Sequence, residues 1–263
     1  MSITNLLYRF SAERVDSDNP HLSAFFPQQQ KAYTFCKQYC RNKRVIEFGC
    51  GSGFGAYRIT EVATSVTAID NDCNTIQHCR AKYKKNNLRF QVNKAEQFIS
   101  KRKFDVAISF QVIEHIESQF VENYLFSIKR ALKPKGVCFI STPNAPLSSY
   151  NENPYHYKEY SGIELKTLLS RYFTQVTLFG VEGDSIVRLF EKRRKERVLS
   201  ALQKDVFRMR NIVPRKMRQV IFDFASYFVR KKLNLFSVNV REKNYQIRTL
   251  RPRSAIDIIA VCR

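Results

Sequence analysis

Short apolar runs alternate with amphipathic segments along the first 180 residues. Near-continuous runs of strand length predict buried strands, and apolar residues spaced three or four apart predict helices. The predicted strands are 44–48, 65–69, 88–92, 104–110, 137–141, 175–179 and, at the end of the chain, 254–262. The predicted helices are 28–40, 57–63, 73–85, 95–100, 119–132 and 163–171. Buried strands that alternate with helices indicate an α/β fold whose mostly parallel sheet has helices on both faces.

We expect one domain with four segments. Residues 1–43 form an N-terminal helical cover, 44–180 the core, 181–253 a basic helical insertion, and 254–263 the final strand. No internal repeat interrupts this order.

The insertion carries much of the positive charge. The chain has 45 Lys and Arg against 23 Asp and Glu, a net charge of +22, and residues 181–263 hold 21 of the basic and 8 of the acidic residues. Within it, 214–232 predicts an amphipathic helix with basic ends. Three interpretations stay open: a helix that packs on the core over a substrate pocket, peripheral contact with an anionic membrane, or a nucleic-acid face, which is less favoured for want of an RNA-binding module.

Other sequence features favour a cytoplasmic protein, with the inner membrane face as a peripheral site. Seven cysteines form no C-x-x-C pair, four histidines show no zinc spacing, and no run of 18 apolar residues occurs.

A glycine-rich turn, Glu47 to Gly55, follows the first predicted strand, and the second strand ends at Asp70. Glycine allows a ligand to approach the backbone closely and permits positive φ angles. A carboxylate at the end of the next strand can accept hydrogen bonds from both hydroxyl groups of a ribose. These features alone fit a nicotinamide cofactor as well as an adenosyl one.

The wider pattern resembles class I S-adenosylmethionine-dependent methyltransferases. The similar segments, in order, are VIEFGCGSGFG, VTAIDND, NKAEQF, KFDVAISFQVIEHI and LKPKGVCFISTPN, and together they span roughly residues 30–180. The resemblance implies a Rossmann-like sheet of seven strands and S-adenosylmethionine as the cofactor.

The resemblance also implies roles for individual residues. Glycines would line the methionine part of the cofactor, Glu47 would anchor its amino group, and other residues would contact the ribose, border the adenine and close the pocket. The glycines are Gly49, Gly51 and Gly53. Asp70 and Asn71 would contact the ribose, Ala95 and Glu96 would border the adenine, and Phe110 and Gln111 would close the pocket. The sequence departs from the family at Lys94, where an acidic residue often accepts from the adenine amine.

Two histidines are candidate catalytic residues. His115 follows the fourth strand, and His156 lies in NPYHYKEY, which resembles a segment of small-molecule methyltransferases, including those of sugar and cell-envelope polysaccharide pathways. Either could act as base in O-methylation of a small molecule or glycan precursor, or could have a purely structural role.

Quinone O-methyltransferases are related and carry E-x-x-E-H, which can hold a divalent metal. Here Gln111 stands at the first position, and an amide is a poorer ligand than a carboxylate, so we expect no metal site. Quinone-type O-methylation at a membrane stays an alternative, as does an RNA-binding methyltransferase or a catalytically silent adenosyl-binding module.

Overall fold

The computed structural model describes residues 26–147, 153, 155–203, 217, 219 and 240–263, without the side chains of 197–203. Its helices are α2 (Phe26–Lys37), α3 (Phe54–Ile59), α4 (Cys73–Lys82), α5 (Val121–Ala131), α6 (Gly162–Leu169) and α7 (Ser185–Gln203). Its short 3-10 turns include η1 (Gln38–Cys40), η2 (Ala95–Gln97), η3 (Ile113–His115), η4 (Ser118–Phe120) and η6 (Glu242–Asn244). Its strands are β1 (Arg44–Phe48), β2 (Ser65–Asp70), β3 (Leu88–Val92), β4 (Phe104–Phe110), β5 (Leu132–Pro143), β6 (Val176–Gly183), β7 (Tyr245–Thr249) and β8 (Ala255–Cys262).

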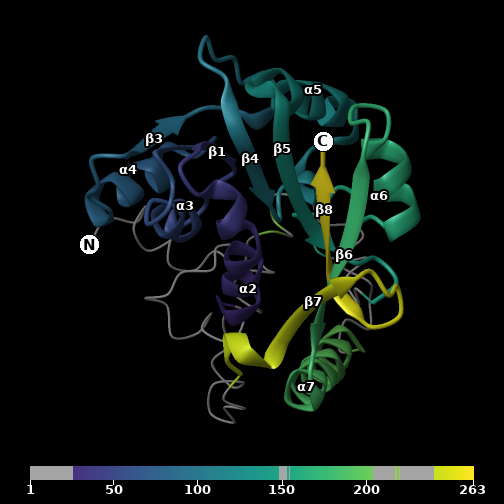
Figure 1. Cartoon of the computed structure of the whole chain (residues 1–263). Coiled ribbons are helices and arrows are strands. Elements are labelled where there is room, and N and C mark those ends of the chain that lie inside the picture. The colour runs from purple at the N-terminus through teal and green to yellow at the C-terminus, as the bar shows by residue number, and fades with distance from the viewer. Residues whose placement is uncertain (1–25, 148–152, 154, 204–216, 218, 220–239) are drawn as a thin grey trace.

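The strands form one sheet in the order β3-β2-β1-β4-β5-β8-β6-β7 (Figure 1). The pairs from β3 to β5 are parallel, whereas β8 runs antiparallel to both β5 and β6, and β7 runs antiparallel to β6. The predicted fold class is therefore confirmed. The strand order reverses at β1, because the chain proceeds outward to β3 and then returns to β4 on the other side of β1.

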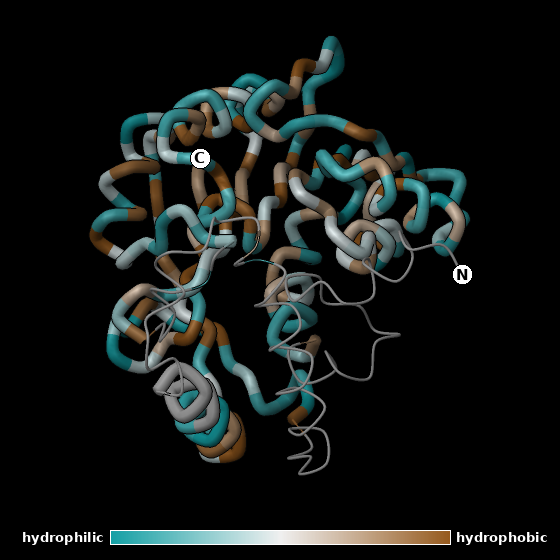
Figure 2. Tube along the Cα trace, turned by 180° about the vertical axis from the view of Figure 1, so that it is seen from behind, coloured by the Kyte–Doolittle hydropathy of each residue, from teal (hydrophilic) through white to brown (hydrophobic). Residues whose placement is uncertain are grey.

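Two apolar cores lie on opposite faces of the sheet. One joins the sheet to α2, α3, α4 and α7 through side chains such as Tyr33, Ile59 and Val187. The other joins it to α5 and α6 through Tyr124 and Leu165, among others. Figure 2 shows the hydrophobic positions gathered along the internal strands, while hydrophilic positions follow the outer turns of the helices.

The structure adds an eighth strand to the seven that the sequence predicts. β7 lies inside the segment predicted to be helical, at the edge of the sheet, and only its first residue, Tyr245, is buried. Five residues with one buried side chain give little periodic signal. The insertion therefore combines α7 with a strand, and β6 continues to Gly183, beyond the predicted end of the core at residue 180. The amphipathic segment 214–232 lies outside the described residues, apart from Met217 and Gln219.

Among the described helices, none has the length and apolar character needed to cross a membrane.

Asn144 fastens the end of β5 to the start of β8. Its side chain is fully buried, and Nδ2 donates to the carbonyl oxygens of Pro252 at 2.8 Å and Ala255 at 2.7 Å. These bonds hold β8 at the edge where the carboxyl ends of β4 and β5 meet (Figure 1).

Asn144→Ala should lower the free energy of unfolding by about 2 kcal/mol, because two carbonyl groups, of which that of Ala255 is buried, lose their donor. Denaturant unfolding followed by circular dichroism measures this. The matched exposed variant Asn86→Ala should change it by less than about 0.5 kcal/mol. Equal effects of the two variants would contradict the anchoring role.

Candidate functional site

The glycine-rich turn lies where β1 separates from its neighbours at the carboxyl edge of the sheet. In open α/β sheets, ligands bind at this point, where the strand order reverses. Gly49, Gly51 and Gly53 have φ angles of 68°, 49° and 75°. These left-handed angles explain why the turn is built from glycine. The N–H of Cys50 donates to the carbonyl oxygen of Ile69 at 2.9 Å, which holds the turn against β2.

Asp70 organises this turn from the end of β2. Its carboxylate accepts hydrogen bonds from the backbone N–H of Gly51 at 3.0 Å and of Asp72 at 3.1 Å. Asp72, not Asp70, caps α4, because its side chain accepts from the N–H of Asn74. Asp70 is thus not occupied as a helix cap and lies beside the glycines, as a ribose contact requires.

Glu47 ends up buried below the turn, with only 1% of its surface exposed. Tyr33 on α2 donates a hydrogen bond to one carboxylate oxygen, Oε1, while Oε2 is buried without a hydrogen-bond partner. Burial raises the pKa of Glu47 to about 8, although the bond from Tyr33 opposes the shift. The group predicted to bind a cationic amine is therefore close to neutral at pH 7 in this structure.

A cavity of about 80 Å³ lies above the turn. Four of the predicted cofactor residues line it, namely Gly49, Gly51, Phe110 and Gln111. Cys50, Ser52, Phe54 and Gly55 also line it, together with Gln29 and Tyr33 from α2. The sequence motifs did not single out Gln29 and Tyr33, because neither belongs to the glycine-rich turn or to the strand ends that carry these motifs. The sequence signal available for Tyr33 was its position shortly after the three glutamines that begin the predicted helix 28–40.

The remaining predicted cofactor residues are not among those that line this cavity. Asn71 is exposed after β2. Ala95 and Glu96 lie in η2, where the carbonyl of Glu96 accepts from Ser127 Oγ at 3.2 Å. Their proposed contacts with the ribose and adenine stay predictions.

Gln111 turns the chain from the cavity toward the histidines. Its φ of 57° is left-handed, which is uncommon for a residue with a side chain. Its backbone N–H donates to the Ser141 carbonyl at 3.0 Å, and Nε2 donates to Ser141 Oγ at 3.3 Å. This strained turn leads directly into η3, which carries Glu114 and His115.

The two predicted histidines come together although 41 positions separate them. The rings of His115 and His156 lie edge to face with centroids 4.8 Å apart. His156 Nδ1 lies 2.8 Å from Glu159 Oε1, and His115 Nδ1 lies 3.2 Å from the carbonyl oxygen of Tyr155. The N–H of Tyr157 donates to the Glu114 carbonyl at 2.7 Å and so ties the second loop to the first.

Glu114 adds a buried carboxyl group to this pair. Its Oε2 accepts from Thr142 Oγ1 at 3.0 Å, whereas Oε1 is buried without a hydrogen-bond partner. Burial raises the pKa of Glu114 to about 8, and the neighbouring His156 opposes this shift.

Donor atoms of Glu114, His115 and His156 all lie within 4.8 Å of one another. Two imidazoles and a carboxylate are a known ligand set for divalent metals, so these residues could hold one. In the sequence, the amide of Gln111 is the argument against a metal, and only the fold brings His156 beside Glu114. The expectation that no metal is used stays a prediction.

Comparison with known proteins now identifies the family. A family model described as a methyltransferase domain matches residues 22–197. The chain is 31% identical to a probable S-adenosylmethionine-dependent methyltransferase of Mycobacterium tuberculosis over 196 residues, 73% of this chain and 70% of that protein. It is 36% identical to one of Mycolicibacterium smegmatis over 151 residues, 55% of this chain and 57% of that protein. The chain thus spans little more than half the length of this second relative.

Ubiquinone biosynthesis O-methyltransferase of Rickettsia bellii is a shorter match, 32% identical over 40% of this chain and 44% of that protein. Two solved structures share the fold. The DhpI complex with S-adenosylhomocysteine has a TM-score of 0.50 at 17% identity and covers 68% of this chain and 88% of its own. The complex between the Haloferax volcanii Trm112 methyltransferase activator and a methyltransferase contains a chain with a TM-score of 0.52 at 15% identity. This match covers 61% of the present chain and 76% of that one.

The chain belongs to the methyltransferase domain family. It is a class I S-adenosylmethionine-dependent methyltransferase, as its sequence motifs predicted, and its cofactor is S-adenosylmethionine.

Two glycines of the turn allow a matched test. A Cβ at Gly49 would lie 2.5 Å from Val112 Cγ2, whereas one at Gly51 would meet nothing within 4 Å. Both positions have left-handed φ angles, so alanine should strain each by about 1–2 kcal/mol. Gly49→Ala should in addition displace the chain after β4 and weaken S-adenosylhomocysteine binding at least about tenfold more than Gly51→Ala, by isothermal titration. Equal losses would show that backbone strain alone decides binding.

Proposed function

We propose that this methyltransferase transfers the methyl group of S-adenosylmethionine to a hydroxyl group of a small molecule or of a sugar or cell-envelope polysaccharide precursor. The observation that carries the proposal is the pair His115–His156 with its two carboxyl neighbours, Glu114 and Glu159. A hydroxyl acceptor must lose a proton during the transfer, so the reaction requires a base. An acceptor that is already deprotonated does not require one.

The donor's residues in this proposal are those around the turn. Gly49, Gly51 and Gly53 give the methionine part access to the backbone, and Glu47 binds its ammonium group. Asp70 and Asn71 hold the ribose, Ala95 and Glu96 border the adenine, and Phe110 and Gln111 close the pocket. The bound donor supplies a methyl group activated by its sulfonium.

His156 is the proposed base. A carboxylate at one ring nitrogen fixes the orientation and tautomer of an imidazole and stabilises its protonated form. Glu159 is placed to do this at 2.8 Å from Nδ1. The other ring nitrogen, Nε2, would then accept the acceptor's proton. His115, in edge contact with this ring, is the second candidate and would help to position it.

Two observations bear on the class of acceptor. The sequence NPYHYKEY favours a small-molecule or glycan acceptor, while the name of the Rickettsia relative favours a quinone-type O-methylation at a membrane. Peripheral membrane contact through 214–232 and a cytoplasmic location stay predictions, because most of that segment lies outside the described residues.

His156→Gln should lower the methyl transfer rate to a hydroxyl acceptor by about 10²–10⁴-fold, because a positioned base contributes about that factor. Glu159→Gln should lower it less, and affinity for S-adenosylhomocysteine should stay unchanged in both. The measurement is formation of S-adenosylhomocysteine with a panel of sugar, lipid-linked glycan and quinol acceptors. His78→Gln on α4 is the matched control and should keep the full rate.

A rate that His156→Gln leaves intact would remove the histidine from the chemistry. Loss of activity after dialysis against a chelator, restored by a divalent ion, would assign Glu114, His115 and His156 to a metal instead. Methylation of structured RNA alone would favour the RNA alternative, and donor binding without transfer to any acceptor would favour the silent module.

A further inference from the structure

Tyr33 of α2 is built into the wall of the donor pocket. A Cβ at Gly55 would lie 1.9 Å from the Cζ atom of Tyr33, so the glycine at this position makes room for the ring. The ring also packs against Phe54 and Phe110, with centroids 5.9 and 5.0 Å away. The Tyr33 hydroxyl therefore reaches Glu47 from a defined position on the helix.

The carboxyl group of Glu47 is only partly satisfied there. It receives the hydroxyl of Tyr33 and the backbone N–H of Ala56, while Oε2 is buried without a hydrogen-bond partner. Within the described residues it forms no ion pair, and its titratable neighbours are Tyr33, Cys36, Cys50 and Asp70. A cationic hydrogen-bond donor would complete such a group.

The methionine part of S-adenosylmethionine carries that cation, its α-ammonium group. The cavity beside Glu47 holds about 80 Å³, whereas small-molecule sites typically enclose roughly 300–1,000 Å³. Tyr33 and Gln29 line this cavity, so their positions limit the room for the donor's methionine part.

We propose that Tyr33 is a positioning residue of the donor site. In the empty pocket its hydroxyl bonds to the protonated Glu47 carboxyl group. When the donor binds, its ammonium group replaces the hydroxyl at Glu47, and one proton is released. The proposal rests on the assignment of Glu47 as the ammonium anchor in the proposed function. The exchange is balanced: the carboxylic acid becomes a carboxylate paired with the ammonium ion, and the proton leaves to solvent.

Electrostatics at the site support this exchange. Burial raises the pKa of Glu47 to about 8, and Asp70 raises it further in the same direction. A bound ammonium group would lower it, since an opposite charge at short range favours the ionised form. Donor affinity should therefore rise with pH until the empty-site pKa is reached.

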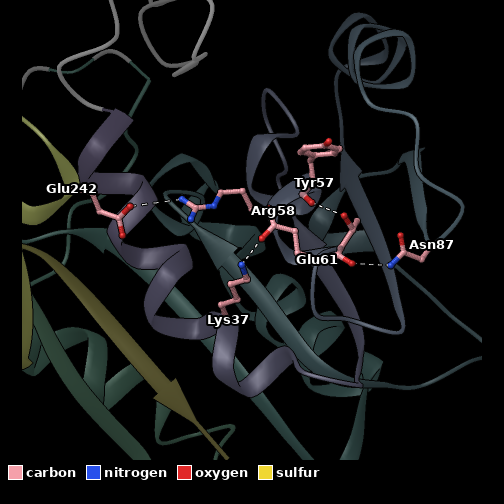
Figure 3. Close-up of polar contacts among 7 residues, drawn as sticks. Lys37, Tyr57, Arg58, Glu61, Asn87 and Glu242 are labelled. Carbon is pink, nitrogen blue, oxygen red and sulfur yellow. Dashed lines mark hydrogen bonds and ion pairs between the residues drawn. The ribbon is translucent and has the colours of Figure 1, made fainter.

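Helix α2 is attached at both ends by contacts other than Tyr33. The ion pair between Lys37 and Glu61 fixes its end (Figure 3), and Phe35 packs against Phe179 with centroids 5.1 Å apart. At its start, Gln28 Nε2 donates to Asp257 Oδ2 at 2.5 Å, and Phe26 packs against Phe54. Tyr33 lies between these attachments, in the second half of the helix, and its bond to Glu47 is the contact that the donor would replace.

The test is isothermal titration of the full chain with S-adenosylhomocysteine, which carries the same ammonium group. Titrations in phosphate and in Tris, whose ionisation enthalpies differ, give the number of protons released. We expect nearly one proton per site, and an affinity about 20-fold higher near pH 7.5 than near pH 6. Any ionisation of the ammonium group itself is shared by titrations of the unmodified chain and of Glu47→Gln, so their difference reports on Glu47.

Three variants separate the parts of the proposal. Glu47→Gln should bind without proton release and with little pH dependence. Tyr33→Phe keeps the ring and should bind the donor as tightly as the unmodified chain or up to about fivefold more tightly, because one competing hydrogen bond is gone. Tyr57→Phe on α3 is the matched control and should behave as the unmodified chain. Circular dichroism and thermal unfolding check that each variant is folded.

Normal donor binding without proton exchange would overturn this inference and leave the proposed function intact. A Tyr33→Phe variant that binds several-fold more weakly would also overturn it, because the hydroxyl would then contact the donor rather than give way. Absence of donor binding in the unmodified chain would overturn both.

Discussion

The hydrogen bond from the Gly51 N–H to the Asp70 carboxylate determines how the donor site is shaped. It joins the ends of the parallel strands β1 and β2, beside the point between β1 and β4 where the strand order reverses. The turn can meet the carboxylate only because Gly49, Gly51 and Gly53 adopt left-handed angles. A second bond, from the N–H of Asp72 to Asp70, sets the start of α4. One side chain thus fixes the floor of the pocket and the helix beside it.

The two halves of the proposed reaction are organised on either side of β4. Tyr33 and Glu47 lie on the α2 side, and Glu114 bonds to Thr142 beside the other core. Gln111 joins these halves through a left-handed backbone held by Ser141. A strained residue kept by several hydrogen bonds is common at functional sites. It would carry the chain from the donor's methyl group to His115, which contacts the proposed base His156, within four residues.

Sequence patterns predicted the strands better than the site. The bounds of β1 and β4 agree with their apolar runs, because buried parallel strands read as nearly continuous apolar stretches. The bounds of β3 also agree, although this edge strand alternates apolar and polar residues and buries only Phe90. Asp70 and the glycines were recognised from family motifs. Tyr33 was not, because a helix pattern shows which face is apolar and not which residue will reach a buried carboxylate. The proximity of Glu114 and His156 was also not predicted, because only the fold brings the loops after β4 and β5 together.

The central claim is that one pocket presents the donor's methyl group to the His115–His156 pair. A crystal structure of the complex with S-adenosylhomocysteine tests it most directly. We predict that the homocysteine sulfur lies between the Gly49 turn and Gln111 and faces His156, with the ammonium group on Glu47. A sulfur that faces away from both histidines, or an ammonium group far from Glu47, would contradict the account.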